Sequence, residues 1–510
     1  MKTITIGEGA LDLNQVGALA QGQARMTVST RSSFLVRMKR SQEVLEQALR
    51  RGIPVYGVST GYGSCCGNQI SPAQRNNMEE LGENLIQYHG CGVGMPLGRE
   101  EVRAAMVCRL ICLAQGYSGV TVDLLSHVSK FLNHDLTPVV PSMGSVGASG
   151  DLTPMSYIAR ALTGEGDVLY RGRIIPARQA LAQAGIKKYR FQLKEPLAFI
   201  NGTSMMTGIA VMALGRARNI LAAAIGGTAL AVHALQGHPE HFHPVIVNTK
   251  PHPGQIFVGE KLRKLLGAVG RQPPGSKNPS DLQDPYSLRC APQILGVVAD
   301  ALEWIEKWIA IEINSANDNP LLDWDRKEVL MGGNFYGGHV AFAMDALKSA
   351  LASTADMLDR QLALLVDPRC NRGLPANLVK TSGGNARVNH GFKAMQITAS
   401  ALTAEALKNT LPAASFSRST ESHNQDKVSM GTIAARDAAR QCYLVSRVAS
   451  IHLLAAVQAC ELRGGLEKRP RIAALVGSVR SRVKENVKDH PMDREIEILA
   501  GSWPEINFLR

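Results

Sequence analysis

Apolar residues recur at helical spacing along most of the chain. In the first 200 residues this spacing predicts helices of ordinary length at 41–51, 72–88, 99–115, 122–133, 152–162 and 176–184. Two short stretches alternate between apolar and polar residues instead, one at the N-terminus and one over 167–175, and this pattern predicts strands. The first part of the chain is therefore expected to be a mixed region in which helices dominate.

From Asn201 onwards the apolar pattern lengthens. It predicts five helices that exceed the average helix length, at 201–235, 287–314, 338–365, 385–411 and 429–463. The predicted fold is mainly α, an elongated bundle of long helices with a smaller N-terminal mixed region that carries the active-site loops. The expected domains are the N-terminal region with two glycine-rich loops, a central bundle and peripheral C-terminal helices, at 1–200, 201–465 and 466–510.

Composition supports close helix packing and argues against some partners. Of the 510 residues 45% are apolar but only 5% are aromatic, which disfavours sandwiches rich in aromatic strands. The net charge is +13, from 56 Lys and Arg against 43 Asp and Glu. These cations are scattered, and no basic tract is interleaved with aromatic residues, so no nucleic-acid partner is expected.

The cysteines and the apolar stretches point to a cytoplasmic protein without a membrane partner. The nine cysteines form no CxxC or zinc spacing, so reduced core thiols are expected. The N-terminus has no signal-peptide core. The most apolar stretch, 220–235, is too short and too rich in Ala and Gly for a membrane span, and we interpret it as a buried helix.

Two glycine-rich loops interrupt the mixed region. The lid loop, residues 55–68, contains four glycines and is expected to move unless it is held. The second loop contains the triplet Ala148-Ser149-Gly150, whose small residues allow the Gly150 amide nitrogen to approach the Ala148 carbonyl carbon. Bond formation there with loss of water gives an imidazolone, and loss of the Ser149 hydroxyl as a second water adds an exocyclic methylidene. The simpler interpretation is a glycine-rich turn before a helix.

The wider context of the triplet resembles the aromatic amino acid ammonia-lyase family, which includes histidine, phenylalanine and tyrosine ammonia-lyases and related aminomutases. The resemblance is carried, in family order, by the motifs at 56–63, 147–152, 199–203, 283–290 and 424–426. It implies a 4-methylidene-imidazol-5-one formed autocatalytically from Ala148, Ser149 and Gly150, with no metal and no diffusible cofactor. It also implies a homotetramer whose active sites are shared between subunits.

The resemblance assigns roles to residues that match the family motifs. Tyr56 matches the base, on a lid that includes Gly57, Gly61, Tyr62 and Gly63. Arg289 matches the clamp for the substrate carboxylate, a task that suits a planar two-pronged donor. Tyr286 and Asn201 match residues that contact the substrate and the electrophile, and Gln283, Phe335 and Gln425 match pocket residues. The simpler alternatives are a packing aromatic for Tyr56, a surface ion pair for Arg289, and ordinary caps or core groups for the others.

Two places bear on the substrate. Tyr88 and His89 offer polar groups at the expected ring end of the pocket, which disfavours phenylalanine. Asn424-Gln425-Asp426, with Glu421 upstream, resembles the tyrosine and phenylalanine branch. We therefore predict tyrosine, or a ring-hydroxylated relative such as dihydroxyphenylalanine, with tyrosine giving 4-coumarate and ammonia. Histidine giving urocanate and an aromatic 2,3-aminomutase are alternatives.

Other features have competing interpretations. His238, His241 and His243 imitate a metal cluster, but their loop resembles a structural loop of the lyase pattern, so we expect turn and capping roles and no metal. The pair Cys65-Cys66 in the lid loop has no assigned function. A hypothesis of another class is a catalytically silent helical scaffold, in which Ser149 would stay unmodified.

Overall fold

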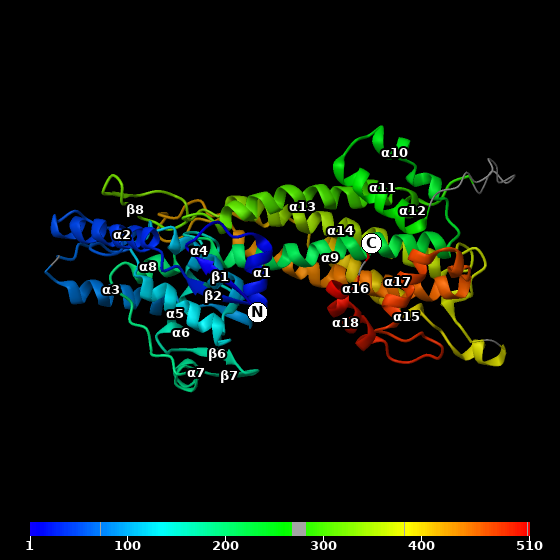
Figure 1. The fold of residues 1–510 in the computed structure, drawn as a ribbon, viewed down its shortest axis with the longest axis horizontal. Coiled ribbons are helices and arrows are strands. Elements are labelled where there is room, and N and C mark those ends of the chain that lie inside the picture. The colour runs from blue at the N-terminus through cyan, green and yellow to red at the C-terminus, as the bar shows by residue number, and fades with distance from the viewer. Residues whose placement is uncertain (72, 268–281, 382, 507, 510) are drawn as a thin grey trace. The chain divides into compact units, whose positions relative to one another are not determined.

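The computed structural model describes residues 1–71, 73–267, 282–381, 383–506 and 508–509, most of which are helical (Figure 1). The chain groups into two units, and each is assembled from three separate segments. The first unit comprises residues 1–215, 306–345 and 412–439, and the second comprises 216–305, 346–411 and 440–510. The expected mainly α fold is confirmed. The division at residues 200 and 465 stays a prediction.

The first unit opens with a two-stranded parallel sheet. Strand β1 (Lys2–Ile6) pairs in register with β2 (Ala24–Val28), and helix α1 (Leu13–Gln21) connects them. A reciprocal pair of hydrogen bonds between Asp12 and Gln15 caps the start of α1. Gly22 ends the helix in a left-handed conformation that glycine adopts easily.

Helix α4 (Arg99–Ala114) forms the core of the first unit. Every residue from Glu101 to Ala114 is buried, and α4 packs against α1 and α5 (Val122–Asn133). The other short helices of this unit are α2 (Ser32–Arg50), α3 (Arg75–Tyr88), α6 (Leu152–Leu162), α7 (Ala177–Ala184) and α8 (Glu195–Ile200). The predicted helices in this part of the chain are confirmed, although α2 begins nine residues before the predicted start at 41.

Small antiparallel sheets connect these helices. Strand β3 (Val93–Pro96) pairs with β5 (Pro141–Met143), and β8 (Leu321–Asp323) pairs with β9 (Glu328–Leu330). The third sheet consists of β4 (Thr137–Pro138), β6 (Asp167–Tyr170) and β7 (Arg173–Pro176), which confirms the strands predicted over 167–175. Since β5 ends at Met143 and α6 begins at Leu152, the triplet lies in the loop between them.

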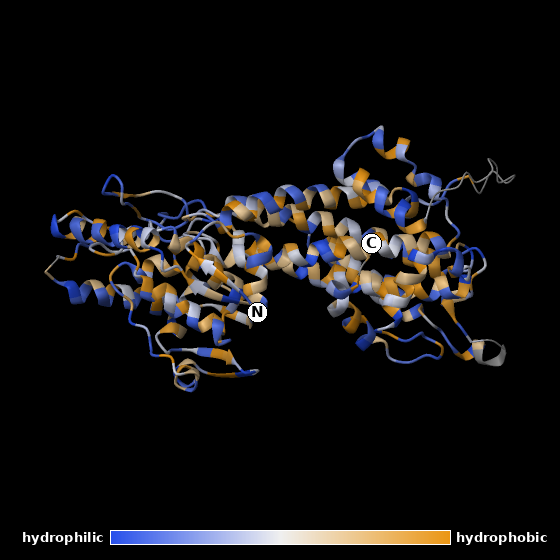
Figure 2. Cartoon of the chain, viewed as in Figure 1, coloured by the Kyte–Doolittle hydropathy of each residue, from blue (hydrophilic) through white to orange (hydrophobic). Residues whose placement is uncertain are grey.

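Four long helices confirm the lengthened apolar pattern: α9 (Ser204–Ala234), α13 (Ala291–Ile313), α14 (Gly338–Val366) and α16 (Gly431–Arg463). By length and composition α9 and α16 could cross a membrane, and Figure 2 shows the hydropathy of each residue along the ribbon. Yet 72% of the apolar window in α9 and 89% of that in α16 are buried within the protein. This burial is typical of core helices and confirms the buried helix predicted at 220–235.

The shorter described helices of the second unit are α10 (Pro244–Asn248), α11 (Pro253–Leu266), α12 (Tyr286–Arg289), α15 (Lys393–Lys408), α17 (Pro470–Arg480) and α18 (Asp493–Ser502). Helix α15 is shorter than the predicted helix at 385–411. The amides of His390 and Gly391 donate to Asp489 over 2.6 and 2.9 Å, and Gly391 has a φ of +52°. Because these groups are turned away from helical geometry, the helix begins only at Lys393.

Candidate active site

One cavity of about 790 Å³ in the first unit collects most of the predicted site residues. Its walls come from the lid loop, the end of α3, the triplet loop, the end of α8, the loops around β8 and β9, and the segment that precedes α16. The predicted residues that line it are Tyr56, Gly61, Tyr62, Gly63, Tyr88, His89, Ala148, Ser149, Asn201, Phe335, Glu421 and Gln425. Segments far apart in the sequence therefore meet at one place.

The triplet loop is fixed by backbone pairing with the segment that follows α8. The Gly202 amide donates to the Ser149 carbonyl over 3.0 Å, and the Asp151 amide donates to the Gly202 carbonyl over 2.8 Å. Gly150 adopts a φ of +74°, and a Cβ there would collide with the backbone of Gly202. Only glycine fits this position without a shift of the backbone.

The Asp151 side chain anchors the same loop through hydrogen bonds. Its side chain is fully buried and accepts hydrogen bonds from the Met206 amide over 2.8 Å and from the Thr432 hydroxyl. Burial raises the pKa of Asp151 to about 6, although the bonds from Thr432 and Met206 oppose that shift. The sequence prediction did not select Asp151, and its position directly after the triplet is the signal that could have identified it.

The triplet fits the imidazolone that the family resemblance implies. The Gly150 side of the turn has no room for a side chain, and the pairing with Gly202 and the buried Asp151 together hold the turn tight. Gln425 contacts the triplet directly, since its Nε2 donates to Ser149 Oγ over 3.2 Å. Since Gln425 Oε1 accepts from the Thr420 hydroxyl over 2.9 Å, the amide is oriented with its donor toward Ser149.

Tyr56 is held at the cavity wall by its own lid loop. The Gly63 amide donates to the Tyr56 hydroxyl oxygen over 2.8 Å, and the Tyr62 ring lies edge-on with its centroid 6.2 Å away. Burial raises the pKa of Tyr56, the Gly63 bond lowers it, and the Glu421 carboxylate raises it further. Gly57, although part of the lid loop, does not line the cavity but packs against Leu197 and Tyr62.

Glu421 contacts the lid loop as well as the cavity. Its carboxylate accepts from the Ser64 amide over 2.9 Å and from the Ser64 hydroxyl over 2.7 Å. Ser64 belongs to the 3₁₀ turn at Gly63–Cys65. The neighbouring thiols of Cys65 and Cys66 are exposed, unpaired by any disulfide, and also line the cavity.

The expected ring end of the cavity is formed at the C-terminal end of α3. His89 Nδ1 lies 2.8 Å from the Leu85 carbonyl oxygen, and because a carbonyl only accepts, Nδ1 carries the proton there. Burial lowers the pKa of His89, which favours the neutral ring with Nε2 as an acceptor. Tyr88 stacks on this ring with a centroid distance of 4.3 Å and is 56% exposed.

Asn201 is buried in the cavity wall, and the acceptors around it determine how its amide is oriented. Nδ2 donates to Asp318 Oδ1 over 3.1 Å and to the Asn319 carbonyl over 3.0 Å, both of which are acceptors. Asp318 is in turn paired with the fully buried Lys194. Phe335 completes the apolar part of the cavity wall.

Three predicted site residues belong to the second unit instead: Gln283, Tyr286 and Arg289. Tyr286 begins the short helix α12 and is 70% exposed. The Arg289 guanidinium lies over the Tyr286 ring, 4.5 Å from its centroid. At this distance the cation is attracted to the face of the aromatic ring.

The histidines that imitate a metal cluster have turn roles in the second unit. His241 Nε2 accepts from the Asp284 amide over 3.1 Å, and the Asp284 carboxylate accepts from the His238 amide over 2.6 Å. His243 Nδ1 caps α10 by accepting from the Val245 amide over 3.2 Å. The predicted turn and capping roles are confirmed for the side chains of His241 and His243, whereas His238 takes part through its backbone amide.

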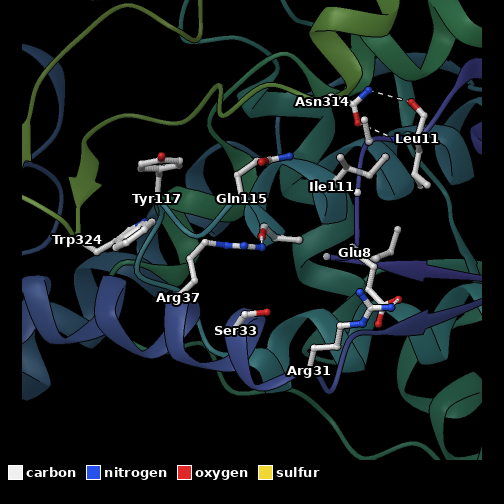
Figure 3. A pocket seen from close by; sticks show the side chains of 15 residues that line it. Glu8, Leu11, Arg31, Ser33, Arg37, Ile111, Gln115, Tyr117, Asn314 and Trp324 are labelled. Atoms are coloured by element: carbon white, nitrogen blue, oxygen red, sulfur yellow. Dashed lines mark hydrogen bonds and ion pairs between the residues drawn. The ribbon is translucent and has the colours of Figure 1, made fainter.

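A second cavity of about 570 Å³ lies elsewhere in the first unit (Figure 3). Glu8 and Arg31 form an ion pair at its rim over 3.1 Å, and Arg37 donates to the Ala114 carbonyl over 3.1 Å. Asn314 exchanges hydrogen bonds with the backbone of Leu11. The cavity contains none of the predicted site residues.

Comparison with known proteins supplies the family. Residues 11–481 match the family described as aromatic amino acid lyase. The chain is 36% identical over 496 residues to the histidine ammonia-lyase of Treponema denticola, covering 97% of this chain and 96% of that protein. Among solved structures it is similar to the tyrosine aminomutase of Streptomyces globisporus, with 34% identity, coverage of 100% and 98%, and a TM-score of 0.90. It also resembles the histidine ammonia-lyase of Trypanosoma cruzi, with 30% identity, coverage of 99% and 94%, and a TM-score of 0.87.

These findings correct the predicted substrate. Tyrosine was favoured because Asn424-Gln425-Asp426 resembles the tyrosine and phenylalanine branch, but relatives that are 35% to 38% identical are named histidine ammonia-lyases. The prediction of a tyrosine lyase is therefore wrong, and the histidine alternative is better supported. The physical reason lies at Gln425, whose amide contacts Ser149 and so reports on the triplet end of the cavity rather than its ring end.

The assignment as an enzyme, in contrast, is confirmed, which removes the silent scaffold as an interpretation. The family match extends over most of the chain, and the relatives cover nearly its full length. The chain belongs to the aromatic amino acid lyase family and is a carbon–nitrogen lyase of the ammonia-lyase type.

Proposed function

We propose that the chain is a histidine ammonia-lyase, which eliminates ammonia from L-histidine to give urocanate. The observation that carries this proposal is the convergence in one cavity of the Ala148-Ser149-Gly150 triplet, the phenol of Tyr56 and the neutral imidazole of His89. The names of the relatives point the same way. The substrate is thus a small amino acid whose ring carries hydrogen-bonding nitrogens.

The triplet would supply the cofactor, a 4-methylidene-imidazol-5-one made from Ala148, Ser149 and Gly150 without a metal or a diffusible cofactor. When formed, this group supplies an electrophile for the substrate amine, so that the nitrogen becomes a better leaving group. Gln425 donates a hydrogen bond to Ser149, and Asn201 lines the same cavity.

Tyr56 is the proposed base that takes the β-proton of the substrate at its phenolic oxygen. A base must be deprotonated to act, and burial of Tyr56 opposes this by raising its pKa. The Gly63 amide stabilises the phenolate through its hydrogen bond of 2.8 Å. The lid loop therefore both positions the Tyr56 ring and favours the negatively charged phenolate.

The ring end of the cavity suits an imidazole. His89 Nε2 can accept a hydrogen bond from an N–H of the substrate ring, because Nδ1 is already committed to Leu85. The Tyr88 hydroxyl can donate to the other ring nitrogen of the substrate. A phenylalanine ring would leave both groups unpaired, and this lowers its affinity relative to histidine.

We propose that the enzyme is a cytoplasmic homotetramer, in which Gln283, Tyr286 and Arg289 complete the active site of another subunit. The exposed fraction of Tyr286, 70%, supports this arrangement because a large aromatic side chain of this kind favours burial against a partner. Arg289 would clamp the substrate carboxylate with two parallel hydrogen bonds. Sedimentation or light scattering of the purified protein tests the assembly.

A substrate panel tests the proposed activity. L-Histidine, tyrosine, phenylalanine and dihydroxyphenylalanine are offered separately, and the products are identified by mass spectrometry. We expect the highest kcat/KM with histidine, urocanate as the product, and loss of turnover in Ser149→Ala. Turnover of tyrosine in preference to histidine, or accumulation of β-amino acids as an aminomutase would give, contradicts the proposal.

Intact-protein mass tests the cofactor separately from activity. We expect a deficit of two water molecules in the native chain and none in Ser149→Ala. A native chain with its full calculated mass contradicts the proposed cofactor.

A further inference from the structure

The residues from Thr420 to Gln425 form a tight turn, the 420–425 turn, that the backbone closes at both ends. The Thr420 amide donates to the Gln425 carbonyl over 2.9 Å, and the Gln425 amide donates to the Thr420 carbonyl over 3.2 Å. Inside the turn Glu421, Ser422 and His423 have φ values of +52°, +52° and +64°. Left-handed backbone is rare for residues other than glycine, and three successive cases beside a cavity indicate strain maintained for function.

One end of this turn contacts the triplet. Gln425 Nε2 donates to Ser149 Oγ over 3.2 Å, while the Thr420 hydroxyl fixes the other end of the same amide. The turn is thereby tied to a loop that is itself pinned to Gly202 by backbone pairing. This end therefore has a defined position relative to the reacting residue.

The other end of the turn contacts the lid loop. Glu421 accepts from both the amide and the hydroxyl of Ser64, and the preceding residue, Gly63, donates its amide to the Tyr56 hydroxyl oxygen. The Glu421 carboxylate also occupies the place where a Cβ on Gly63 would lie. The absence of a side chain at Gly63 thus lets the carboxylate approach the lid loop closely.

Because the turn is short and strained, its two ends are held at a fixed separation. We infer that the 420–425 turn is a positioning element that sets the place of Tyr56 relative to Ser149, with Glu421 as the residue that holds the lid loop. Glu421 acts through Ser64 and Gly63 and does not itself take part in bond making. This inference rests on the proposed function, in which Tyr56 is the base and Ser149 belongs to the electrophile.

The surroundings of Tyr56 allow the role of Glu421 to be separated from that of its neighbours. Tyr62, Cys66, Tyr88 and Glu421 are the titratable groups that act on Tyr56. Glu421 combines a hydrogen bond to the lid loop with an electrostatic effect on the phenol. Substitutions that remove the hydrogen bonds or only the charge are therefore expected to have different consequences.

The experiment compares Glu421→Ala and Glu421→Gln with the native chain. Glu46→Gln is the matched control, because Glu46 pairs with the exposed Arg75 and does not line the cavity. Amide hydrogen exchange is measured over the lid loop. We expect exchange of the Gly63 and Ser64 amides to be about tenfold faster in Glu421→Ala, since a hydrogen bond to a charged group is lost. Glu421→Gln retains an acceptor and is expected to restore most of the protection.

The pH dependence of kcat/KM separates charge from position. The negative charge of Glu421 raises the pKa of Tyr56, so Glu421→Gln should move the low-pH limb of the profile to lower pH. Glu421→Ala should in addition lower kcat about tenfold because the base loses its position. Intact mass should still show loss of two water molecules in both variants.

The inference is overturned if both variants match Glu46→Gln in lid exchange and in the pH profile. Failure of the proposed function looks different, because the native chain would then not convert histidine to urocanate. The exchange measurement would still report whether Glu421 holds the lid loop.

Discussion

The triplet loop (residues 144–151) and the lid loop (residues 55–68) are both rich in glycine and both reach the same cavity, but they are held in opposite ways. The triplet loop pairs with the Gly202 backbone and is anchored by the fully buried Asp151. The lid loop is held by Glu421, a carboxylate on an exposed residue. Hydrogen bonds to a buried carboxylate are stronger than those to an exposed one, because water competes less.

This difference separates two tasks within one active site. The peptide proposed to form the electrophile is held by buried groups, whereas the lid loop that carries the base is fastened at Ser64 by an exposed carboxylate. Substrate must enter and product must leave past the lid loop, so weak attachment there is useful. The variants below test whether the two loops differ as strongly as their contacts indicate.

The largest effect is expected from Gly150→Ala. A Cβ at this position would collide with the Gly202 backbone, and the residue would also keep a φ of +74° that alanine tolerates poorly. Because the turn cannot keep its shape, we expect the intact mass to show no loss of water and lyase activity to fall to background.

Gly166→Ala is the matched control for this substitution. Gly166 has a φ of +69°, but a Cβ there would meet no atom within 4 Å. We expect this variant to lose about 1–2 kcal/mol of stability and to keep its modified triplet. Equal loss of modification in both variants would show that backbone strain, and not the contact with Gly202, is responsible.

The next largest effect is expected from Asp318→Ala, which leaves the ammonium of Lys194 buried without its partner. Loss of one member of a buried ion pair costs about 3–5 kcal/mol. The Asn201 amide also loses an acceptor, so activity should fall together with stability. Denaturant unfolding measures the change.

Glu46→Ala is the control for an exposed pair, that with Arg75, and should cost less than about 1 kcal/mol. A similar cost for both variants would mean that the buried pair of Lys194 and Asp318 contributes no more to stability than a surface pair.

Most of the fold and most of the cavity could be predicted from the sequence, because both depend on local patterns. Helical spacing gave α5 and α6 with their observed ends, and the motif matches selected Tyr56, Ser149 and Asn201, which line one cavity. Helix α15 was predicted too long, since its start depends on contacts of His390 and Gly391 with the distant Asp489.

The contacts that distinguish the two loops could not be predicted, because they join residues far apart in the chain. Asp151 meets Thr432 across 281 positions, and Ser64 meets Glu421 across 357. From the sequence we predicted that Glu421 and Gln425 bind the substrate. The sequence does not show that Glu421 contacts Ser64 and that Gln425 contacts Ser149. The substrate was mistaken for the same reason, since Gln425 faces Ser149.

A smaller effect is expected from Asp151→Asn, which keeps the shape of the anchor and removes its charge. We expect a loss of about 1–2 kcal/mol near neutral pH, because the asparagine amide has one acceptor oxygen and cannot accept both the Met206 and the Thr432 hydrogen bonds. Thermal unfolding at several pH values measures it, and Gly166→Ala, which changes no titratable group, serves as the reference.

The same variant should also change the pH dependence of stability. Burial raises the pKa of Asp151 from 3.8 to about 6, so the folded state binds a proton that the unfolded state has released between these values. Stability from this group is therefore complete below about pH 4 and is lost as pH rises through 6. The advantage of the native chain over Asp151→Asn should shrink across that window, and an advantage that grows there would contradict the raised pKa.

The smallest effect on stability is expected from Ser64→Ala, which removes one hydrogen bond between the lid loop and Glu421. Since this bond lies at an exposed residue, global stability should change by less than about 0.5 kcal/mol. Exchange of the lid amides should nevertheless rise severalfold, because local opening needs far less free energy than global unfolding. If Ser64→Ala instead lowers the melting temperature as much as Asp151→Asn, the lid loop unfolds together with the triplet loop. The base would then sit on a segment as fixed as the electrophile, and substrate entry would require another part of the wall to move.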